Sequence, residues 1–432
     1  MTGDVGGARH LYVHLPFCVH RCGYCDFVTV VGRQDQHEAY VDALLAELEH
    51  ERSALADPLE TVFLGGGTPT FTEPEALHRV LAALPAAAEV TVEANPETMT
   101  PGLAELLRDG GVNRISLGAQ TFTPRLLDVL ERVASPDDVR RAVHTLRDAS
   151  FDNISLDVIY GIPGQEPSDL AHDLAEALAL APEHLSLYEL EAKPGTRFTH
   201  AWGGELDRQS EAMEGYFERV VETLTHAGYR WYETANFCLV GDRAMGRDLR
   251  AHHNLGYWQG RDYLGVGIGA VSTLGEERRR NGASIGRYIG ALSVGGAPGA
   301  LSVGGAPGAG GAPGAPGAPG VGGAPGAPGV GGAPGAPGAG GAPGVGGAPP
   351  RELEQLDPLT KAQERLMLGL RLDEPVPLDG LESAIDPAGL ERMVAGGLAV
   401  IAGRSGEGDG QTLSLTHRGR FLGGGVTAEL LA

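Results

Sequence analysis

Residues 12–27 read YVHLPFCVHRCGYCDF, in which a short apolar run leads into three cysteines, Cys18, Cys22 and Cys25. The spacing C-x3-C-x2-C allows one short loop to wrap three thiolates around a single inorganic cube. Three ligands leave one iron of a [4Fe-4S] cluster without protein coordination, and the amino and carboxylate groups of S-adenosylmethionine (SAM) can occupy that position. The cysteines therefore predict a cluster that binds SAM.

Taken alone, these cysteines leave two other interpretations open. One is a zinc site completed by His14 or His20, and the other is a chance grouping in a loop. A disulfide framework fits poorly, because three of the 4 cysteines fall close together in one loop. The cysteine usage therefore favours a metal or cluster site in a reducing compartment.

The composition narrows the class of protein further. A chain of 432 residues with 42% hydrophobic residues can fill two or three domain cores. Its formal net charge of -23 repels phosphate backbones, so we expect no nucleic-acid partner. We see neither the ~20 continuous apolar residues of a membrane-spanning helix nor a signal peptide, and we predict a cytoplasmic protein.

The first half of the chain repeats a unit in which a short β-branched run is followed by an Ala- and Leu-rich helical stretch. This alternation predicts βα units and a parallel sheet. The expected strands are residues 11–17, 61–64, 89–93, 114–118, 153–159 and 184–190. Such strands form either a barrel or an open doubly wound sheet, and in both the reactive site lies at the carboxyl ends of the strands.

A glycine-rich stretch, GGGTPT at residues 65–70, directly follows the second expected strand. Glycines at a strand end let a ligand approach the backbone, although the same run is also typical of a tight turn. Its position one strand after the cysteines favours the ligand.

The second half of the chain has a different organisation. Residues 295–349 consist of Gly-Ala-Pro-Gly and Gly-Gly-Ala-Pro repeats, which predict a disordered linker. A collagen helix is the alternative, but the paired glycines break its register. Residues 360–372 have helical spacing, 381–398 fit two short helices, and 412–415 alternate as a strand does. We therefore expect a small helical, winged-helix-like C-terminal domain with a strand pair.

Several short segments, which are quoted at the end of this paragraph, occur in order at the ends of the expected strands. This order resembles the radical-SAM superfamily, and the wording of the segments resembles the radical-SAM heme chaperone family, which is related to oxygen-independent coproporphyrinogen III oxidase. The resemblance covers residues 11 to about 272 and resumes weakly at Arg351. It rests on residues 12–27, GGGTPT (65–70), EANP (93–96), RISLGAQ (114–120), ISLDVIYGIPG (154–164) and HLSLY (184–188).

The resemblance implies a partial (β/α)6 barrel over residues 1–200 and assigns a set of site residues. By resemblance, SAM is held by Tyr12, Gly66, Gly67, Thr68, Glu93, Gln120, Arg132 and Asp157, while Tyr24 lies beside the cluster. Carboxylate and amide groups can bond the ribose or the ammonium of SAM, and a guanidinium can neutralise its carboxylate. The alternative is that these residues are strand-end caps, satisfied polar groups or surface cations.

A second motif, HHNLGYW at residues 252–258, lies in an expected barrel extension over residues 201–294. It resembles the His-Asn-x-x-Tyr-Trp motif of the heme chaperones, which implies that His253 ligates heme iron. Spacing alone fits a hydrogen-bonded core histidine as well. The chain departs from the family at Val271, where a second histidine is often found.

The resemblance implies a heme chaperone that binds heme and passes it to acceptor proteins, with an electron donor for the cluster. It leaves peripheral contact with a membrane open. The alternative is an enzyme that oxidatively decarboxylates coproporphyrinogen III. We favour the carrier over the enzyme, because Asp26 and Phe27 follow Cys25 where the decarboxylases typically have a further cysteine. Cys238, the remaining cysteine, receives no role.

Overall fold

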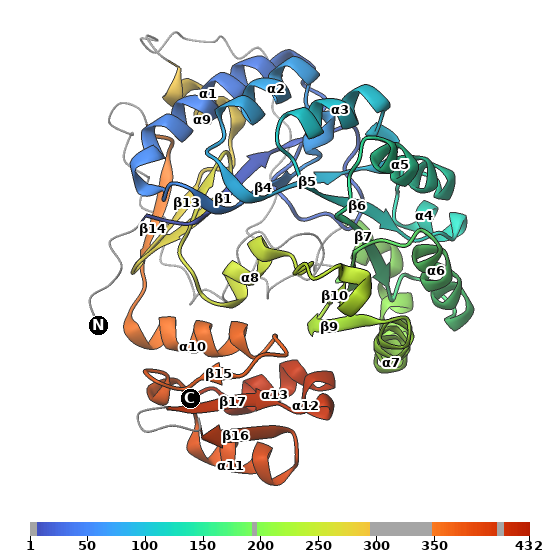
Figure 1. Ribbon diagram of the computed structural model, residues 1–432, viewed down its shortest axis with the longest axis vertical. Helices are drawn as coiled ribbons and strands as arrows, with labels where there is room; N and C mark the ends of the chain where they lie inside the picture. The colour runs from blue at the N-terminus through green and yellow to red at the C-terminus, as the bar shows by residue number, and fades with distance from the viewer. Residues whose placement is uncertain (1–6, 192–196, 294–347, 404–409) are drawn as a thin grey trace.

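The structure is a computed structural model that describes residues 7–191, 197–293, 348–403 and 410–432. Its centre is a parallel sheet in which six strands follow one another in sequence order (Figure 1). The strands are β1 (His10–Leu15), β4 (Leu59–Gly66), β5 (Ala87–Ala94), β6 (Arg114–Gln120), β7 (Ile154–Tyr160) and β8 (His184–Glu189). The six predicted strands and the partial barrel are thus confirmed.

The sheet continues beyond these six strands at both edges, giving 12 strands in the described part of the chain. β11 (Tyr263–Val266) pairs in parallel with β1, and three antiparallel strands follow it. These three are β12 (Val271–Leu274), β13 (Glu277–Asn281) and β14 (Arg351–Gln355). At the other edge, β10 (Asn236–Leu239) and β9 (Tyr229–Glu233) extend β8 in antiparallel fashion. The sequence predicted none of these edge strands.

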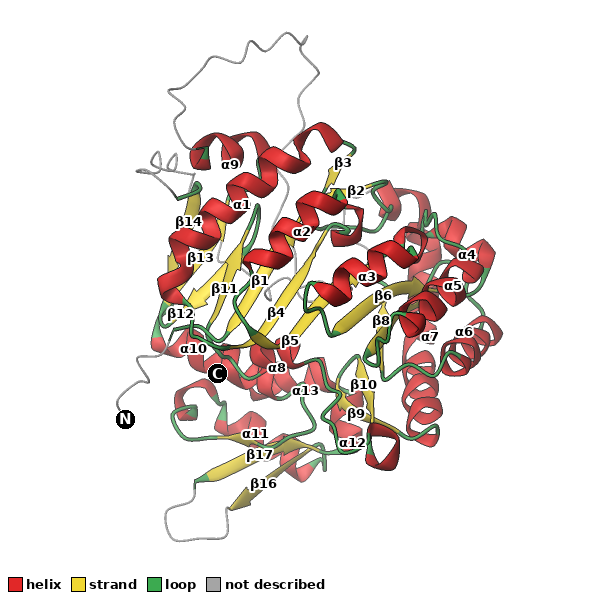
Figure 2. Ribbon diagram, turned by 45° about the horizontal axis from the view of Figure 1, so that its top comes forward, coloured by secondary structure: helices red, strands yellow, loops and turns green. Residues whose placement is uncertain are grey.

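Helices cover the outer face of the sheet between successive parallel strands (Figures 1 and 2). They are α1 (His37–Glu51), α2 (Pro74–Ala83), α3 (Pro101–Asp109), α4 (Pro124–Val129), α5 (Pro136–Asp148), α6 (Pro167–Ala179) and the long α7 (Arg197–His226). Five of them, α2 to α6, start with a proline, whose fixed φ suits the first helical turn. Fully buried strand residues such as Val62, Ile115 and Leu156 pack beneath them. This layer holds the strand ends in fixed positions.

Shorter elements complete the barrel region. β2 (Phe17–Cys18) and β3 (Val30–Val31) form a small parallel pair that brackets the cysteine loop. α8 (His252–Trp258) contains the second motif, and α9 (Ile285–Leu292) packs on α1. Turns of 3-10 helix occur at Gln34–Gln36, Arg52–Ala54, Pro69–Phe71, Pro96–Thr98, Gly241–Ala244 and Glu382–Ala384.

The C-terminal region lies beside α8 and β9 (Figure 1). It contains α10 (Pro358–Gly369), α11 (Pro387–Ala395), α12 (His417–Phe421) and α13 (Gly423–Leu430). An antiparallel sheet in the order β15-β17-β16 joins β15 (Val376–Pro377), β17 (Gln411–Leu415) and β16 (Ala399–Gly403). A hydrophobic cluster of its own, which includes Leu366 and Leu413, fills its interior. The predicted helical C-terminal region is therefore confirmed, and its sheet has three strands where a strand pair was expected.

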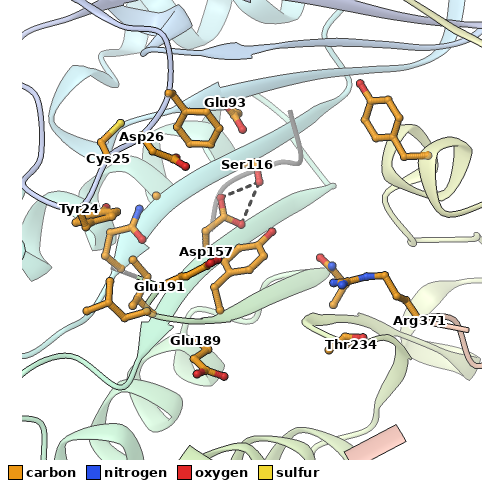
Figure 3. Close-up of a pocket in the computed structure, with 18 of the residues that line it drawn as sticks. Tyr24, Cys25, Asp26, Glu93, Ser116, Asp157, Glu189, Glu191, Thr234 and Arg371 are labelled. Carbon is orange, nitrogen blue, oxygen red and sulfur yellow. Dashed lines mark hydrogen bonds between the residues drawn. The ribbon is translucent and has the colours of Figure 1, made fainter. Parts of the chain in front are cut away.

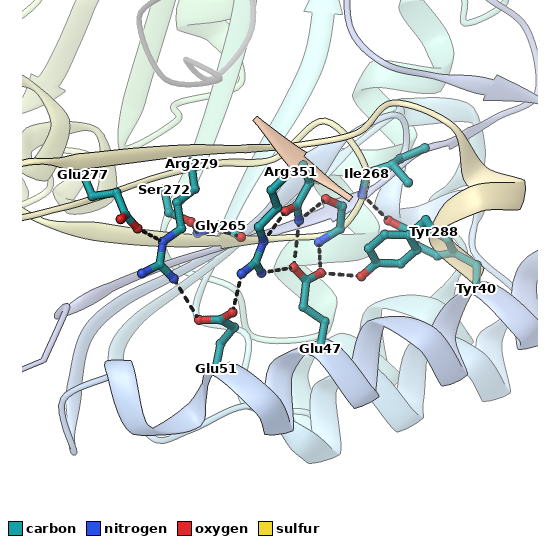
Figure 4. A network of polar contacts seen from close by, with 12 residues as sticks. Tyr40, Glu47, Glu51, Gly265, Ile268, Ser272, Glu277, Arg279, Tyr288 and Arg351 are labelled. Carbon is teal, nitrogen blue, oxygen red and sulfur yellow. Dashed lines mark hydrogen bonds and ion pairs between the residues drawn. The ribbon is translucent and has the colours of Figure 1, made fainter. Parts of the chain in front are cut away.

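The chain returns to the large sheet immediately before this region. Arg351, the first residue of β14, pairs with Glu47 and Glu51 of α1 at 2.8 and 2.6 Å (Figure 4). The predicted linker, residues 295–349, lies almost entirely outside the described residues, and the proposed domain boundaries remain predictions. No helix in the described ranges combines the length and the apolar character needed to cross a membrane.

Candidate cluster and SAM site

The carboxyl ends of the parallel strands open into one large cavity of about 1060 Å³ (Figure 3). The structure brings together there all the residues that the resemblance assigned to the cluster and to SAM. They are Tyr12, Cys18, Cys22, Tyr24, Cys25, Gly66, Gly67, Thr68, Glu93, Gln120, Arg132 and Asp157. Residues from β1, β4, β5, β6 and β7 and the loops after them thus meet in one space, while the individual roles stay predictions.

The cysteine loop is attached to the glycine loop by backbone hydrogen bonds. The amide of Gly67 donates to the carbonyl of Leu15 at 2.8 Å, and the amide of Thr68 donates to the carbonyl of Phe17 at 2.8 Å. The Thr68 hydroxyl also donates to Sγ of Cys18 at 3.7 Å. These bonds fix the position of the cysteine loop relative to the glycine loop at the end of β4.

The two glycines at the end of β4 are required by close packing of the chain itself. A Cβ on Gly66 would lie 2.3 Å from the His14 ring, and a Cβ on Gly67 would lie 2.5 Å from the backbone of Pro16. Gly66 also has a φ of 109°, which favours glycine. Its amide donates to Glu93 at 3.1 Å. These glycines position the cysteine loop whether or not a ligand approaches them.

The thiols have a chemistry that suits a cluster. Burial raises the pKa of the Cys18 thiol and raises the pKa of Cys25 to about 11, so both are protonated at neutral pH without iron. Iron must displace these protons, because only thiolates ligate it. The guanidinium of Arg132 lies 3.5 Å from Sγ of Cys22 and is oriented to stabilise negative charge on sulfur.

Both histidines considered for zinc have other partners. Nε2 of His14 donates to the carbonyl of Val28 at 2.8 Å, so its Nδ1 accepts from the Tyr12 hydroxyl at 3.0 Å. His20 is half exposed and lies 3.7 Å from the carboxylate of Glu131. No set of three His, Cys, Asp or Glu side chains within the described ranges is gathered for a single metal ion. The three free thiols of one short loop match the three-cysteine ligand set that leaves one iron of a [4Fe-4S] cluster open.

A chain of polar contacts links the cysteines to the ends of β5 and β6. Asn95 donates to the Thr68 hydroxyl at 3.0 Å and accepts from Nη2 of Arg132 at 2.8 Å. Arg132 also donates to the carbonyl of Gly118 at 3.2 Å. Gln120 has a φ of 64°, which side-chain-bearing residues seldom adopt, and strain of this kind is concentrated at functional sites.

Asp157 lies at the centre of the cavity wall. The Ser116 hydroxyl donates to its two carboxylate oxygens at 3.2 and 3.0 Å (Figure 3). Burial raises the pKa of Asp157, and the serine hydroxyls oppose that rise. The arrangement fixes an acceptor that faces the cavity, as a partner of hydroxyl or ammonium groups must be.

Sequence reasoning missed Asn95 and Ser116 as supports of the site. Asn95 stood in the EANP segment and could have been singled out as a polar side chain directly after a strand. Ser116 lies inside β6, where sequence alternation gives no signal that its hydroxyl reaches Asp157.

His253 is not brought into this cavity. It lies in α8 and is 1% exposed, with Nδ1 2.7 Å from the Thr61 hydroxyl and Nε2 2.9 Å from the Tyr257 hydroxyl. Its ring also stacks on Phe63 with centroids 5.1 Å apart. Burial holds the pKa of His253 well below its usual range, so the ring is neutral. In this arrangement neither nitrogen is available for iron, as expected of the core histidine that spacing alone allowed.

We predict that His253→Ala reduces the free energy of unfolding by about 1–3 kcal/mol, because it removes the buried partner of the Tyr257 hydroxyl and leaves the Thr61 hydroxyl with His10 alone. We expect heme affinity to change little. Urea denaturation and an optical heme titration measure the two effects, and Tyr257→Phe, which removes one of the two bonds, is the graded control. Loss of heme affinity with unchanged stability would instead identify His253 as the ligand.

Comparison with known proteins agrees with this geometry. Residues 12–177 match the radical SAM superfamily. The chain is 35% identical over 291 residues to the heme chaperone HemW of Bacillus subtilis (strain 168), covering 65% of this chain and 75% of that protein. The chain belongs to the HemW family. This HemW-family chain is also 35% identical over 268 residues to the heme chaperone HemW of Escherichia coli (strain K12), covering 60% and 68% of the two chains.

A solved structure of coproporphyrinogen III oxidase (HemN) from Escherichia coli, a radical SAM enzyme, has the same fold as the HemW-family chain. The TM-score is 0.71, and the match covers 98% of this chain and 90% of that one. At 19% sequence identity the likeness is evidence of fold alone. Membership of the radical SAM superfamily implies a [4Fe-4S] cluster and SAM, and the cysteines and cavity residues above fit both groups.

Proposed function

We propose that this protein binds heme and transfers it to heme-accepting proteins, with a [4Fe-4S] cluster and SAM in the same cavity. Cys18, Cys22 and Cys25 hold the cluster, which when bound supplies an iron with an open position and a route for electrons. Tyr12, Tyr24, Gly66, Gly67, Thr68, Glu93, Gln120, Arg132 and Asp157 form the SAM site. The relatives named heme chaperones support the heme-binding role.

The size and shape of the cavity carry this proposal. Its volume of about 1060 Å³ is at the upper limit of the ~300–1,000 Å³ typical of small-molecule sites. The cysteines and the SAM residues account for only part of its lining. The same cavity is also lined by Met213, Phe217, Trp258, Leu370, Phe421 and Leu431. Such an apolar and aromatic surface suits the face of a large macrocycle.

The neighbourhood of the cysteines favours a carrier over the decarboxylase. Asp26 and Phe27 come directly after Cys25 and both line the cavity. The next cysteine in the chain is Cys238, which lies buried in β10 and does not line the cavity. A fourth thiol is thus not provided beside the cluster loop.

An anaerobic assay tests this proposal. Iron-reconstituted protein is incubated with SAM, a reductant and coproporphyrinogen III, and separately titrated with heme. We expect saturable heme binding, transfer of heme to an apo-acceptor, and no repeated release of carboxyl groups from coproporphyrinogen III. Release of carboxyl groups over many turnovers would overturn the carrier proposal in favour of oxidative decarboxylation. Contact with an electron donor and with a membrane surface belongs to the same proposal and is tested by adding each component to the transfer assay.

A further inference from the structure

One wall of the cavity comes from the C-terminal region and has no part in the cluster or SAM site. This C-terminal wall consists of Leu415 of β17, Arg420 of α12, Leu422, and Gly424, Thr427 and Leu431 of or beside α13. It is mainly apolar, and Gly424 leaves open space, since a Cβ there would meet nothing within 4 Å. Arg420 is its only cation among these residues.

Arg420 is held in place by an aromatic face and a single hydrogen bond. Its guanidinium carbon lies 3.6 Å from the centroid of the Trp231 ring. Nη1 donates to the carbonyl of Trp231 at 2.9 Å. Phe421 and Phe217 pack around Trp231 with ring centroids 5.3 and 5.6 Å away, so the cation is fixed against a rigid aromatic group.

Two further donor atoms of Arg420, Nε and Nη2, are enclosed and have no hydrogen-bond partner among the residues that the structure describes. Burial lowers the pKa of Arg420 to about 10, so the group is still a cation at neutral pH. Burial of a guanidinium whose N–H groups have no acceptor costs free energy. A carboxylate in the plane of the guanidinium can accept from two of these N–H groups at once, so it is the acceptor that fits best.

Arg371, a second arginine that lines the cavity, has a carboxylate partner. Nε of Arg371 donates to the buried carboxylate of Glu233 at 2.7 Å, and its guanidinium carbon lies 4.5 Å from the Trp258 ring. Arg371 and Arg420 each lie against a tryptophan ring, but within the described residues only Arg371 is at ion-pair distance from a carboxylate. Asp373 and Glu233 oppose the lowering of the pKa of Arg420 from farther away, and Arg420 lines the cavity.

We propose that Arg420 receives a propionate carboxylate of heme, whose macrocycle lies along the C-terminal wall. This inference rests on the proposed function and adds to it the place and the orientation of the heme. A porphyrin combines a flat apolar body with carboxylates at one edge, which matches an apolar wall that carries one guanidinium with no carboxylate at ion-pair distance among the described residues. His253 does not contribute to this proposed heme-binding position.

The test compares Arg420→Gln with Arg418→Gln in the full-length, iron-reconstituted protein. Arg418 lies on the same helix, is exposed and does not line the cavity, so it is a matched control. Heme and heme dimethyl ester, whose propionates are blocked, are titrated optically against each protein. Thermal denaturation of each variant reports on folding.

We expect Arg420→Gln to weaken heme binding by about tenfold or more, which corresponds to ~1.4 kcal/mol, while Arg418→Gln leaves it unchanged. The dimethyl ester should bind the unaltered protein about as weakly as heme binds Arg420→Gln. The affinity for the dimethyl ester should be the same in Arg420→Gln as in the unaltered protein. Equal affinities for heme in the unaltered protein, Arg420→Gln and Arg418→Gln would overturn the proposed role of Arg420 while leaving the proposed function intact.

Failure of the unaltered protein to bind heme would overturn the proposed function itself, and the proposed role of Arg420 with it. If Arg420→Gln does not fold, the comparison of heme with its ester in the unaltered protein still decides the matter. Equal affinity for the two ligands would show that no propionate is recognised.

Discussion

Replacement of Cys18, Cys22 and Cys25 together by alanine is expected to abolish cluster assembly and SAM binding. The three thiols line one cavity, and Arg132 lies 3.5 Å from Cys22, so the site loses all its iron ligands at once. Anaerobic iron and sulfide analysis should fall from about four of each per chain to background. Calorimetric titration with SAM should lose its binding heat, because the open iron that SAM occupies is gone.

Cys238→Ala is the matched control for this prediction. Cys238 is 2% exposed in β10, and burial raises its pKa to about 12, so it is a protonated core residue that cannot ligate iron readily. Its replacement should leave iron, sulfide and SAM binding unchanged. Iron retained by the triple variant would place the cluster elsewhere, and zinc in the unaltered protein would refute the cluster.

The parts of the fold that the sequence predicted are those whose signal is local. Each parallel strand is buried on both faces and therefore reads as a short apolar run, as in residues 61–64 of β4. The three cysteines were also predictable from their spacing after the first strand, whereas Glu93 and Asp157 were assigned only by resemblance to the family. Their convergence follows from parallel topology, since the carboxyl ends of parallel strands share one edge.

The parts that were missed depend on partners far along the chain. β13 reads ERRRN at residues 277–281 and has no apolar alternation. It is a strand because Arg278 pairs with Glu364 at 2.6 Å and Arg279 with Glu51 at 3.5 Å, contacts that no window of sequence contains. Arg420 meets Trp231 for the same kind of reason, across 189 residues of chain.

His253 illustrates a different limit. A histidine with a tyrosine four residues later on a helix fits a ligand with an aromatic neighbour and equally fits a hydrogen-bonded core pair. Only the position of Thr61, on a strand 192 residues away, distinguishes the two, because it occupies the second nitrogen. The motif residues of α8 therefore brace β4 from the inner side of the sheet.

The polar network of Figure 4 braces β14 and the cysteine loop from the outer side. Tyr40 of α1 donates to the carbonyl of His14 at 2.7 Å and accepts from the amide of Ile268 at 3.2 Å. About two and three turns farther along α1, Glu47 and Glu51 bind Arg351. One helix thus holds both the strand that leads into the cysteines and the strand that begins the C-terminal part of the chain.

Glu47→Ala is therefore expected to reduce the free energy of unfolding by about 3–5 kcal/mol, the usual cost of removing one partner of a buried ion pair. Glu47 is fully buried and accepts from Arg351 at 2.8 Å, Asn281 at 2.7 Å and the amide of Gly267 at 2.8 Å, as well as from Tyr288. The Gly267 amide and the Tyr288 hydroxyl would lose their buried acceptor, whereas Arg351 would keep Glu51 and Asn281 as partners. The midpoint of urea denaturation should fall with an unchanged slope.

Glu49→Ala makes the same chemical change two residues away on α1, where the side chain is 75% exposed and pairs only with Arg52. Exposed pairs contribute about 0–1 kcal/mol, so this variant should match the unaltered protein. Arg351→Ala should destabilise as Glu47→Ala does, and the double variant should lose less than the sum, because the two side chains act on one contact. Equal stability of Glu47→Ala and Glu49→Ala would show that β14 is held by its backbone pairing to β13 and not by this network.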